Sequence, residues 1–198
     1  MHSARACLLG RHALFHCACV RDSLFTYSFA AVMNIAKQIV GYLKSRSLVL
    51  VSVETGTAGA IGAMLADQRG AAGCLDLGCV AHSQAALAAL AGVSAQTIER
   101  NGLISEALAR EVAEGALARS AGRASVALAS IGWLADEHDE PGAIVTHCLA
   151  WACIERGRVH SMGETVCFSG RRSEIRRSIA RRALLGLPRF VDGVLTRD

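Results

Sequence analysis

Aromatic side chains are scarce in this sequence: they make up 5% of its 198 residues, although 52% of the residues are hydrophobic. Alanine, valine, leucine and glycine must therefore fill the core, and such residues suit closely packed layers of helices on a sheet. A chain of this length can bury one full core. No apolar run reaches the roughly 18 residues that cross a bilayer, so we expect no membrane partner.

Concentrated positive charge is also missing. The formal net charge is only +4, and no basic tract is interleaved with aromatic residues, so the sequence does not predict nucleic-acid binding. None of the eight cysteines forms a Cys-x-x-Cys pair. Cys17 and Cys19 with His16 resemble half of a zinc site, but no second half follows. We interpret the cysteines as free thiols in a reducing cytoplasm and expect no metal and no cofactor.

The first 32 residues differ from the rest of the chain. They contain Arg5, Arg11 and Arg21 and no acidic residue before Asp22, which is a feature of Arg-rich targeting segments. They lack an apolar signal core and a small-residue cleavage site, so we interpret them as an upstream extension that is poorly ordered. On this interpretation Met33 is the natural start, and residues 33–198 form a single domain.

The stretch Leu48–Gly59 is the most informative part of the sequence. An apolar run ends at Val53, and the corner Glu54-Thr55-Gly56-Thr57-Ala58-Gly59 follows. A helical pattern then begins, so the stretch predicts a strand, a tight turn and a helix. Such a turn leaves short hydroxyls and bare backbone N–H groups at a helix N-terminus, where anions and nucleophilic hydroxyls are useful. Many turns of this kind are only connections, and that alternative stays open.

The remaining patterns predict further helices and strands. We expect helices over Asn34–Arg46, Ser83–Ala91, Ser94–Glu99, Ser105–Arg119 and Ser169–Leu185, strands over Cys74–Ala81 and Ser125–Ile131, an acidic loop at Asp136–Pro141, and a hairpin of Ala143–Ile154 with Arg158–Cys167. Helices and strands alternate first, and the hairpin comes later. This order predicts an α/β fold, a three-layer α/β/α sandwich with a mixed sheet.

Several segments resemble the C-terminal domain of the CinA family, the nicotinamide-nucleotide amidohydrolases. The family corner Glu-Ser-Cys-Thr-Gly-Gly is matched by the corner at Glu54, and the family segment Val-Thr-Tyr-Ser-Asn-Glu-Ala-Lys by the stretch from Val80 to Leu87. Gly102-Leu103-Ile104-Ser105-Glu106 and Phe168-Ser169-Gly170-Arg171-Arg172 match later family motifs. The resemblance runs from about Asn34 to Leu187 and implies the same fold.

In this family, a serine and a lysine, with a tyrosine, are thought to open an amide bond. Here the serine position holds Thr55, the lysine position Leu87 and the tyrosine position His82. Leucine cannot transfer a proton, and a hydroxyl is a poor nucleophile without a base. The catalytic candidates are therefore Thr55 and His82, with His82 either acting as the base or only filling the space of the tyrosine.

The candidate substrate-binding residues follow from the same resemblance. They are Thr57, Gly59, Ser83, Ser130, Arg172 and Arg176. The resemblance places a phosphate-contacting arginine of the family at Arg172, and Arg176 follows one helical turn later, so the pair can share one phosphate. The alternative is a solvated basic helix face, because the same helix also carries Arg177, Arg181 and Arg182.

Two functions follow from these residues. The first is hydrolysis of the carboxamide of nicotinamide mononucleotide, with Thr55 in the nucleophile position and Arg172 on the phosphate. The second is a catalytically inactive relative that acts as a nucleotide-binding or assembly subunit. A third interpretation is altered chemistry led by His82. In each case we expect a small phosphorylated nucleotide as the ligand and a homo-oligomer as the assembly.

Overall fold

The computed structural model describes residues 29–134 and 144–196. The predicted extension is therefore described only from Phe29 onward, and the predicted acidic loop lies outside the described residues. The strands are β1 (Leu50–Glu54), β2 (Leu75–Val80), β3 (Val126–Ile131), β4 (Ile144–Glu155) and β5 (Arg158–Ser169). The helices are α1 (Phe29–Ser45), α2 (Ala60–Ala66), α3 (Gln84–Ala91), α4 (Ala95–Asn101), α5 (Glu106–Arg119) and α6 (Arg172–Leu195), with a 3₁₀ turn at Ala71–Gly73.

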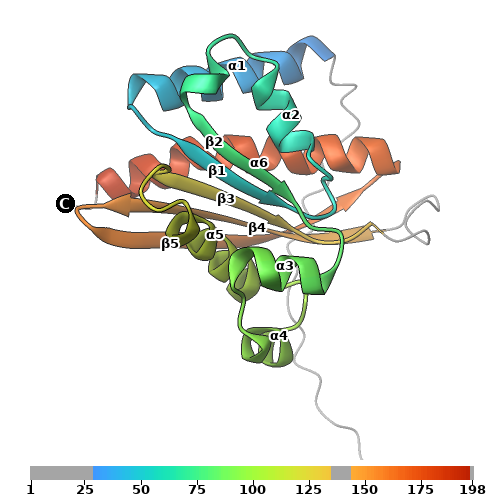
Figure 1. Ribbon diagram of the computed structural model, residues 1–198. Coiled ribbons are helices and arrows are strands. Elements are labelled where there is room, and N and C mark those ends of the chain that lie inside the picture. The colour runs from blue at the N-terminus through green and yellow to red at the C-terminus, as the bar shows by residue number, and fades with distance from the viewer. Residues whose placement is uncertain (1–28, 135–143, 197–198) are drawn as a thin grey trace, which may run out of the picture.

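The five strands form one mixed sheet in the order β2-β1-β3-β4-β5. β1 pairs in parallel with both β2 and β3, whereas β4 is antiparallel to β3 and to β5. Helices α1, α2 and α6 cover one face, and α3, α4 and α5 lie on the other (Figure 1). The predicted α/β/α sandwich with a mixed sheet is confirmed.

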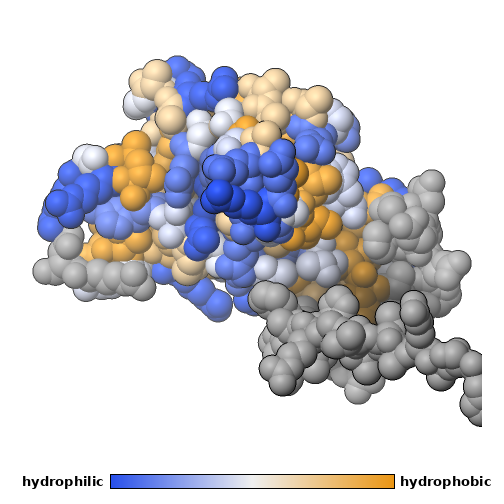
Figure 2. Space-filling model, turned by 90° about the horizontal axis from the view of Figure 1, so that it is seen from below, coloured by the Kyte–Doolittle hydropathy of each residue, from blue (hydrophilic) through white to orange (hydrophobic). Residues whose placement is uncertain are grey.

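The core consists of two hydrophobic clusters, one on each face of the sheet. Successive side chains of a strand point to opposite faces, so Leu128 of β3 packs in the cluster with α1, α2 and α6, while Ala127 packs in the cluster with α3 and α5. Every residue of β1 and β3 is buried, as expected for central strands covered on both faces. Figure 2 shows the α3–α5 side, where a hydrophilic centre lies between hydrophobic patches.

Three helices begin beside the serines at which the sequence predicted their starts. The hydroxyls of Ser83, Ser94 and Ser105 accept backbone N–H groups in the first turns of α3, α4 and α5, which is the usual contribution of serine at this position. No helix among the described residues is long and apolar enough to cross a membrane.

The bounds of two predicted helices are wrong. The helix expected from Asn34 begins earlier, at Phe29. Ser169 does not cap a helix, because it is the last residue of β5, and the helix begins at Arg172 after Arg171, whose N–H donates to Glu174. This helix also continues beyond the predicted end at Leu185. It does so through Pro188 because Leu187, Phe190 and Val191 extend its buried stripe.

Candidate functional site

The predicted corner lies where the order of the parallel strands reverses. From β1 the chain passes through α2 to β2 on one side, and later returns to β3 on the other side of β1. In open α/β sheets, ligands bind outside the carboxyl ends of the strands at such a point. The turn after β1 and the residues after β3 are therefore the first place to examine for a site.

In this chain, hydrogen bonds join the residues that follow β1 to the end of β3 and to the residue after it. The Thr55 N–H donates to Ser130 O at 3.0 Å, and the Gly56 N–H donates to Gly132 O at 2.7 Å. A Cβ atom at Gly56 would lie 2.4 Å from Gly132 O. Only a glycine permits this close approach, which holds the two backbones together where a ligand would otherwise enter.

The Thr55 hydroxyl takes part in this closure. Its Oγ1 donates to Gly132 O at 2.7 Å and accepts the Gly132 N–H at 2.9 Å. Ser130 O lies 3.2 Å from the same oxygen, and the residue is only 2% exposed. A nucleophilic hydroxyl gives its proton to a base, whereas this one is enclosed and gives its proton to a backbone carbonyl. In this structure Thr55 is a buried link between β1 and β3.

A second set of polar groups forms a buried chain beneath the corner. Thr57 Oγ1 lies 3.2 Å from Ser130 Oγ, which lies 2.8 Å from His147 Nε2. All three residues are at most 1% exposed. Burial lowers the pKa of His147 to about 4, so the imidazole is neutral at pH 7. The structure thus places two predicted substrate-binding residues, Thr57 and Ser130, in one network with a histidine.

Sequence reasoning missed His147. Its signal was a single histidine in the apolar run that became β4, and a histidine there marks a position that needs a polar partner. Its Nδ1 has no hydrogen-bond partner among the described residues. Gly132 lies against this ring: a Cβ at Gly132 would come within 2.3 Å of Nδ1. The glycine therefore makes room for the imidazole.

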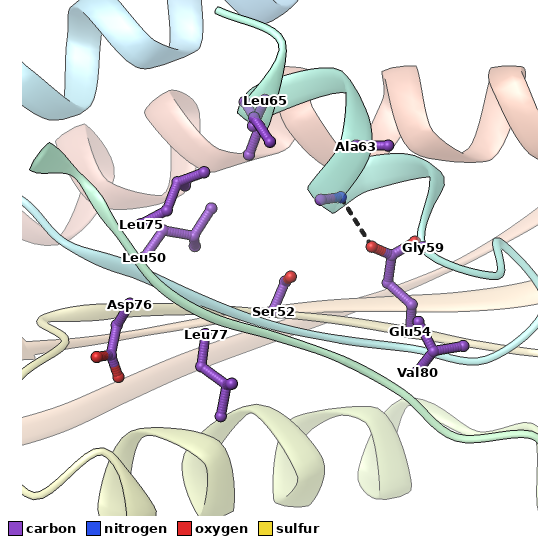
Figure 3. A pocket seen from close by; sticks show the side chains of 13 residues that line it. Leu50, Ser52, Glu54, Gly59, Ala63, Leu65, Leu75, Asp76, Leu77 and Val80 are labelled. Carbon is purple, nitrogen blue, oxygen red and sulfur yellow. Dashed lines mark hydrogen bonds between the residues drawn. The ribbon is translucent and has the colours of Figure 1, made fainter. Parts of the chain in front are cut away.

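The first turn of α2 is satisfied by the chain itself. Glu54 is 1% exposed, and its carboxylate accepts the N–H groups of Ile61 at 3.1 Å and Gly62 at 2.9 Å, the latter drawn in Figure 3. The Ala60 and Ala63 N–H groups donate to carbonyls of the turn. The prediction of bare N–H groups at this helix start is therefore wrong, because a buried carboxylate already provides the negative charge that a helix N-terminus favours.

The arginines of α6 lie at the same corner. Arg176 Nε donates to Gly56 O at 3.1 Å, which joins residues 120 positions apart in the sequence. Arg172 lies one turn earlier on the helix and is half-buried. Other arginines of this helix are exposed, including Arg177 and Arg182, and Arg182 forms two hydrogen bonds with the Glu164 carboxylate of β5.

Beside the corner, a cavity of about 310 Å³ opens between α2, the edge strand β2 and its neighbour β1. Its lining includes Gly59 of the corner and Glu54 (Figure 3). No group of three or more His, Cys, Asp or Glu residues suited to a metal occurs within 29–134 or 144–196.

Comparison with known proteins identifies the family. The model of the CinA C-terminal domain matches residues 32–191. The chain belongs to the CinA C-terminal domain family. The nicotinamide-nucleotide amidohydrolase PncC of Escherichia coli K12 is 30% identical over 155 residues, which cover 77% of this chain and 90% of PncC. A CinA-like protein of Akkermansia muciniphila is 30% identical over 154 residues, and the chain spans only 36% of its length.

Solved structures of CinA superfamily proteins have the same fold. The competence damage-inducible protein A of Klebsiella pneumoniae superposes with a TM-score of 0.68 at 28% identity, covering 78% of this chain and 93% of that one. A CinA superfamily protein of Escherichia coli gives the same TM-score at 25% identity, covering 82% and 91%.

Within this CinA domain, neither His82 nor Ser83 is hydrogen-bonded to the Thr55 hydroxyl in the described structure. His82 is exposed after β2, and the described partners of the Thr55 hydroxyl are backbone groups of Ser130 and Gly132 instead of His82. The Ser83 hydroxyl caps α3 by accepting the Ala86 N–H at 3.1 Å. Leu87, at the family's lysine position, is fully buried in the cluster with α5.

Proposed function

We propose that this chain binds a small phosphorylated nucleotide at the corner between β1 and α6, without opening an amide bond through Thr55. The observation that carries the proposal is the enclosed Thr55 hydroxyl, which is bonded to both backbone groups of Gly132. Leu87 supports it, because a fully buried leucine offers no proton acceptor where the family has its lysine. The ligand class is suggested by the PncC relative, which is a nicotinamide-nucleotide amidohydrolase.

The arginines at the start of α6 supply the phosphate contact in this proposal. Arg176 is fixed beside the corner by its bond to Gly56 O, and Arg172 lies one turn away on the same helix. Hydrogen bonds between a guanidinium and a phosphate contribute about 1.5–3 kcal/mol each. A nucleotide should therefore bind more tightly than its nucleoside, and added salt should reduce the difference.

The second candidate is hydrolysis of the carboxamide of nicotinamide mononucleotide to ammonia and the acid. The chain Thr57–Ser130–His147 favours it, because it joins two hydroxyls to a neutral imidazole that is able to accept a proton. In this candidate Thr57 replaces Thr55 as the hydroxyl near the substrate. Catalysis through His82 stays a third prediction, since His82 is open to solvent at the end of β2.

One experiment separates the candidates. Purified protein is incubated with nicotinamide mononucleotide and assayed for ammonia, and the affinities for this nucleotide and for nicotinamide riboside are measured by calorimetry. Binding without release supports the first proposal, and release supports the second. Absence of both contradicts both and favours an assembly role, which the native mass of the expected homo-oligomer then tests.

Matched arginine variants test the phosphate contact. Arg172→Ala should remove most of the affinity difference between nucleotide and nucleoside. Arg177→Ala is the control, because Arg177 is exposed on the same helix and outside the proposed pair. Equal losses in the two variants would show that only the overall charge of α6 matters, and an Arg172→Ala protein that binds as before would overturn the assignment.

A further inference from the structure

The cavity beside β2 has a structural origin in small residues and a short helix. α2 has only seven residues, so it covers β1 but leaves part of the edge strand β2 open. The register of β1 against β2 shifts at Asp76, and Gly78, which lines the cavity, has no side chain to fill it. A Cβ at Gly78 would lie 3.5 Å from Ser52 Oγ. Because glycine has no Cβ, the Ser52 hydroxyl borders the cavity at this point.

The walls of the cavity are mostly aliphatic. Leu50 and Leu75 of the strands face Leu65 of α2 across it, and Val80 closes the end near the corner (Figure 3). On the opposite wall, α2 presents small residues, which are Gly62, Ala63 and Ala66. A volume of about 310 Å³ is at the lower end of the range for small-molecule sites, so it suits a single ring with one substituent.

The polar side chains of the cavity can all accept hydrogen bonds, and the Ser52 hydroxyl can also donate one. Ser52 Oγ and the Glu54 carboxylate project from β1 toward α2 (Figure 3). Each Glu54 oxygen accepts one N–H of α2 and keeps a lone pair for a further donor. Asp76 also borders the cavity, and its charge is paired with Arg123 at 3.0 Å. Among the described lining residues there is no Lys, Arg or His, so the N–H groups at the start of α2 are the groups that offset the negative charge of Glu54.

We propose that this cavity is a binding site for a small ring compound that carries N–H donors, as a cation or as a neutral amide, and that it rejects anions. Aliphatic walls hold the ring, and Glu54 and Ser52 provide a negative potential and acceptors at one end. The site does not include the α6 arginines: Arg176 is bonded to Gly56 O, and neither Arg172 nor Arg176 lines the cavity. It stands whether or not the chain binds a nucleotide.

Three compounds of nearly equal shape test whether the cavity prefers a positive charge on the ligand to a negative one. Benzamidine is a cationic donor, benzamide is neutral, and benzoate is an anion, while the ring stays the same. Their affinities for the full chain are measured from the methyl resonances of Leu65, Leu75 and Val80 in NMR titrations. We expect benzamidine to bind most tightly, benzamide less tightly, and benzoate at least about tenfold more weakly than benzamidine.

Variants that fill the space test the location. Ala63 is exposed on α2, so Ala63→Phe should occupy the cavity and weaken benzamidine binding at least about tenfold. Gly78→Val fills it from β2 and should do the same, which covers the case that one variant fails to fold. Ala118→Phe is the control, because Ala118 is exposed on α5 away from the cavity lining.

Several outcomes would overturn the proposal. Equal affinity of all three compounds would mean that the cavity binds rings without discriminating between ligand charges. Benzamidine binding that survives both filling variants would place it elsewhere. Titrations that leave the three methyl resonances unchanged would show that the cavity takes no such ligand. The Arg172→Ala experiment is independent of each of these outcomes, because Arg172 does not line the cavity.

Discussion

The Thr55 hydroxyl and the Gly132 backbone are bonded to each other twice: Oγ1 donates to Gly132 O at 2.7 Å and accepts the Gly132 N–H at 2.9 Å. The two residues are 77 positions apart in the sequence. This pair joins the ends of β1 and β3 at the point where a ligand would approach an open α/β sheet. A hydroxyl at the family's nucleophile position thus holds the fold together here.

The Thr55 link should be measurable as stability. Thr55→Val keeps the shape of the side chain but leaves buried Gly132 groups without a partner, which should lower the free energy of unfolding by about 1–3 kcal/mol. Thr55→Ser retains the hydroxyl and should cost about 1 kcal/mol or less. Urea unfolding of both variants measures the difference. Equal stability of the two would mean that the hydroxyl bonds contribute nothing.

Gly132 and His147 should show strong coupling. Gly132→Ala places a Cβ where Nδ1 of His147 now lies, 2.3 Å away, and overpacking of this kind costs about 1–3 kcal/mol. His147→Ala removes the ring, so the double variant should tolerate the alanine. Unfolding free energies of the two single variants and the double variant form the cycle, and additive effects would contradict the contact.

The buried imidazole should make stability depend on pH. Folding lowers the pKa of His147 to about 4 from its usual 6.5, so between these values the unfolded chain binds a proton that the folded chain does not. The free energy of unfolding should therefore fall as the pH drops from 6.5 to 4, by about 3 kcal/mol in all, and this contribution should be constant above 6.5.

The same pH series on two variants shows whether His147 causes this pH dependence of the free energy of unfolding. His147→Gln keeps a partner for Ser130 but does not titrate, so it should remove the contribution. His82→Gln is the control, since His82 is exposed. Urea unfolding at several pH values between 4 and 7 gives the curves, and an unchanged slope in His147→Gln would assign the dependence to other groups.

Restoring the family's lysine should destabilise this chain. Leu87 is fully buried among apolar side chains, so Leu87→Lys should lower the free energy of unfolding by about 3–5 kcal/mol. Ala89→Lys, at an exposed position of the same helix, should change it by less than about 0.5 kcal/mol. Thermal melts compare the two. If Leu87→Lys combined with Thr55→Ser is stable and releases ammonia, the predicted destabilisation is wrong, and the changes at these two positions are what silence the site.

Local patterns in the sequence were sufficient for much of the fold. The apolar run before Glu54 and the helical spacing after it predicted a strand, a corner and a helix, and helices were predicted to start at Ser83, Ser94 and Ser105, whose hydroxyls cap them in the structure. These features depend on hydrogen bonds and side-chain spacing within a few residues, which the chain carries wherever it folds.

The hydrogen-bond partners of the hydroxyls at the corner were decided only by the tertiary structure. The bond from Thr55 to Gly132 and the chain from Thr57 through Ser130 to His147 depend on the register of β3 against β1 and of β4 against β3. No local pattern specifies that register, because it follows from how whole strands and the helices on both faces pack. By itself the sequence determined which hydroxyls stand at the corner, and packing decided that Thr55 faces a backbone instead of a substrate.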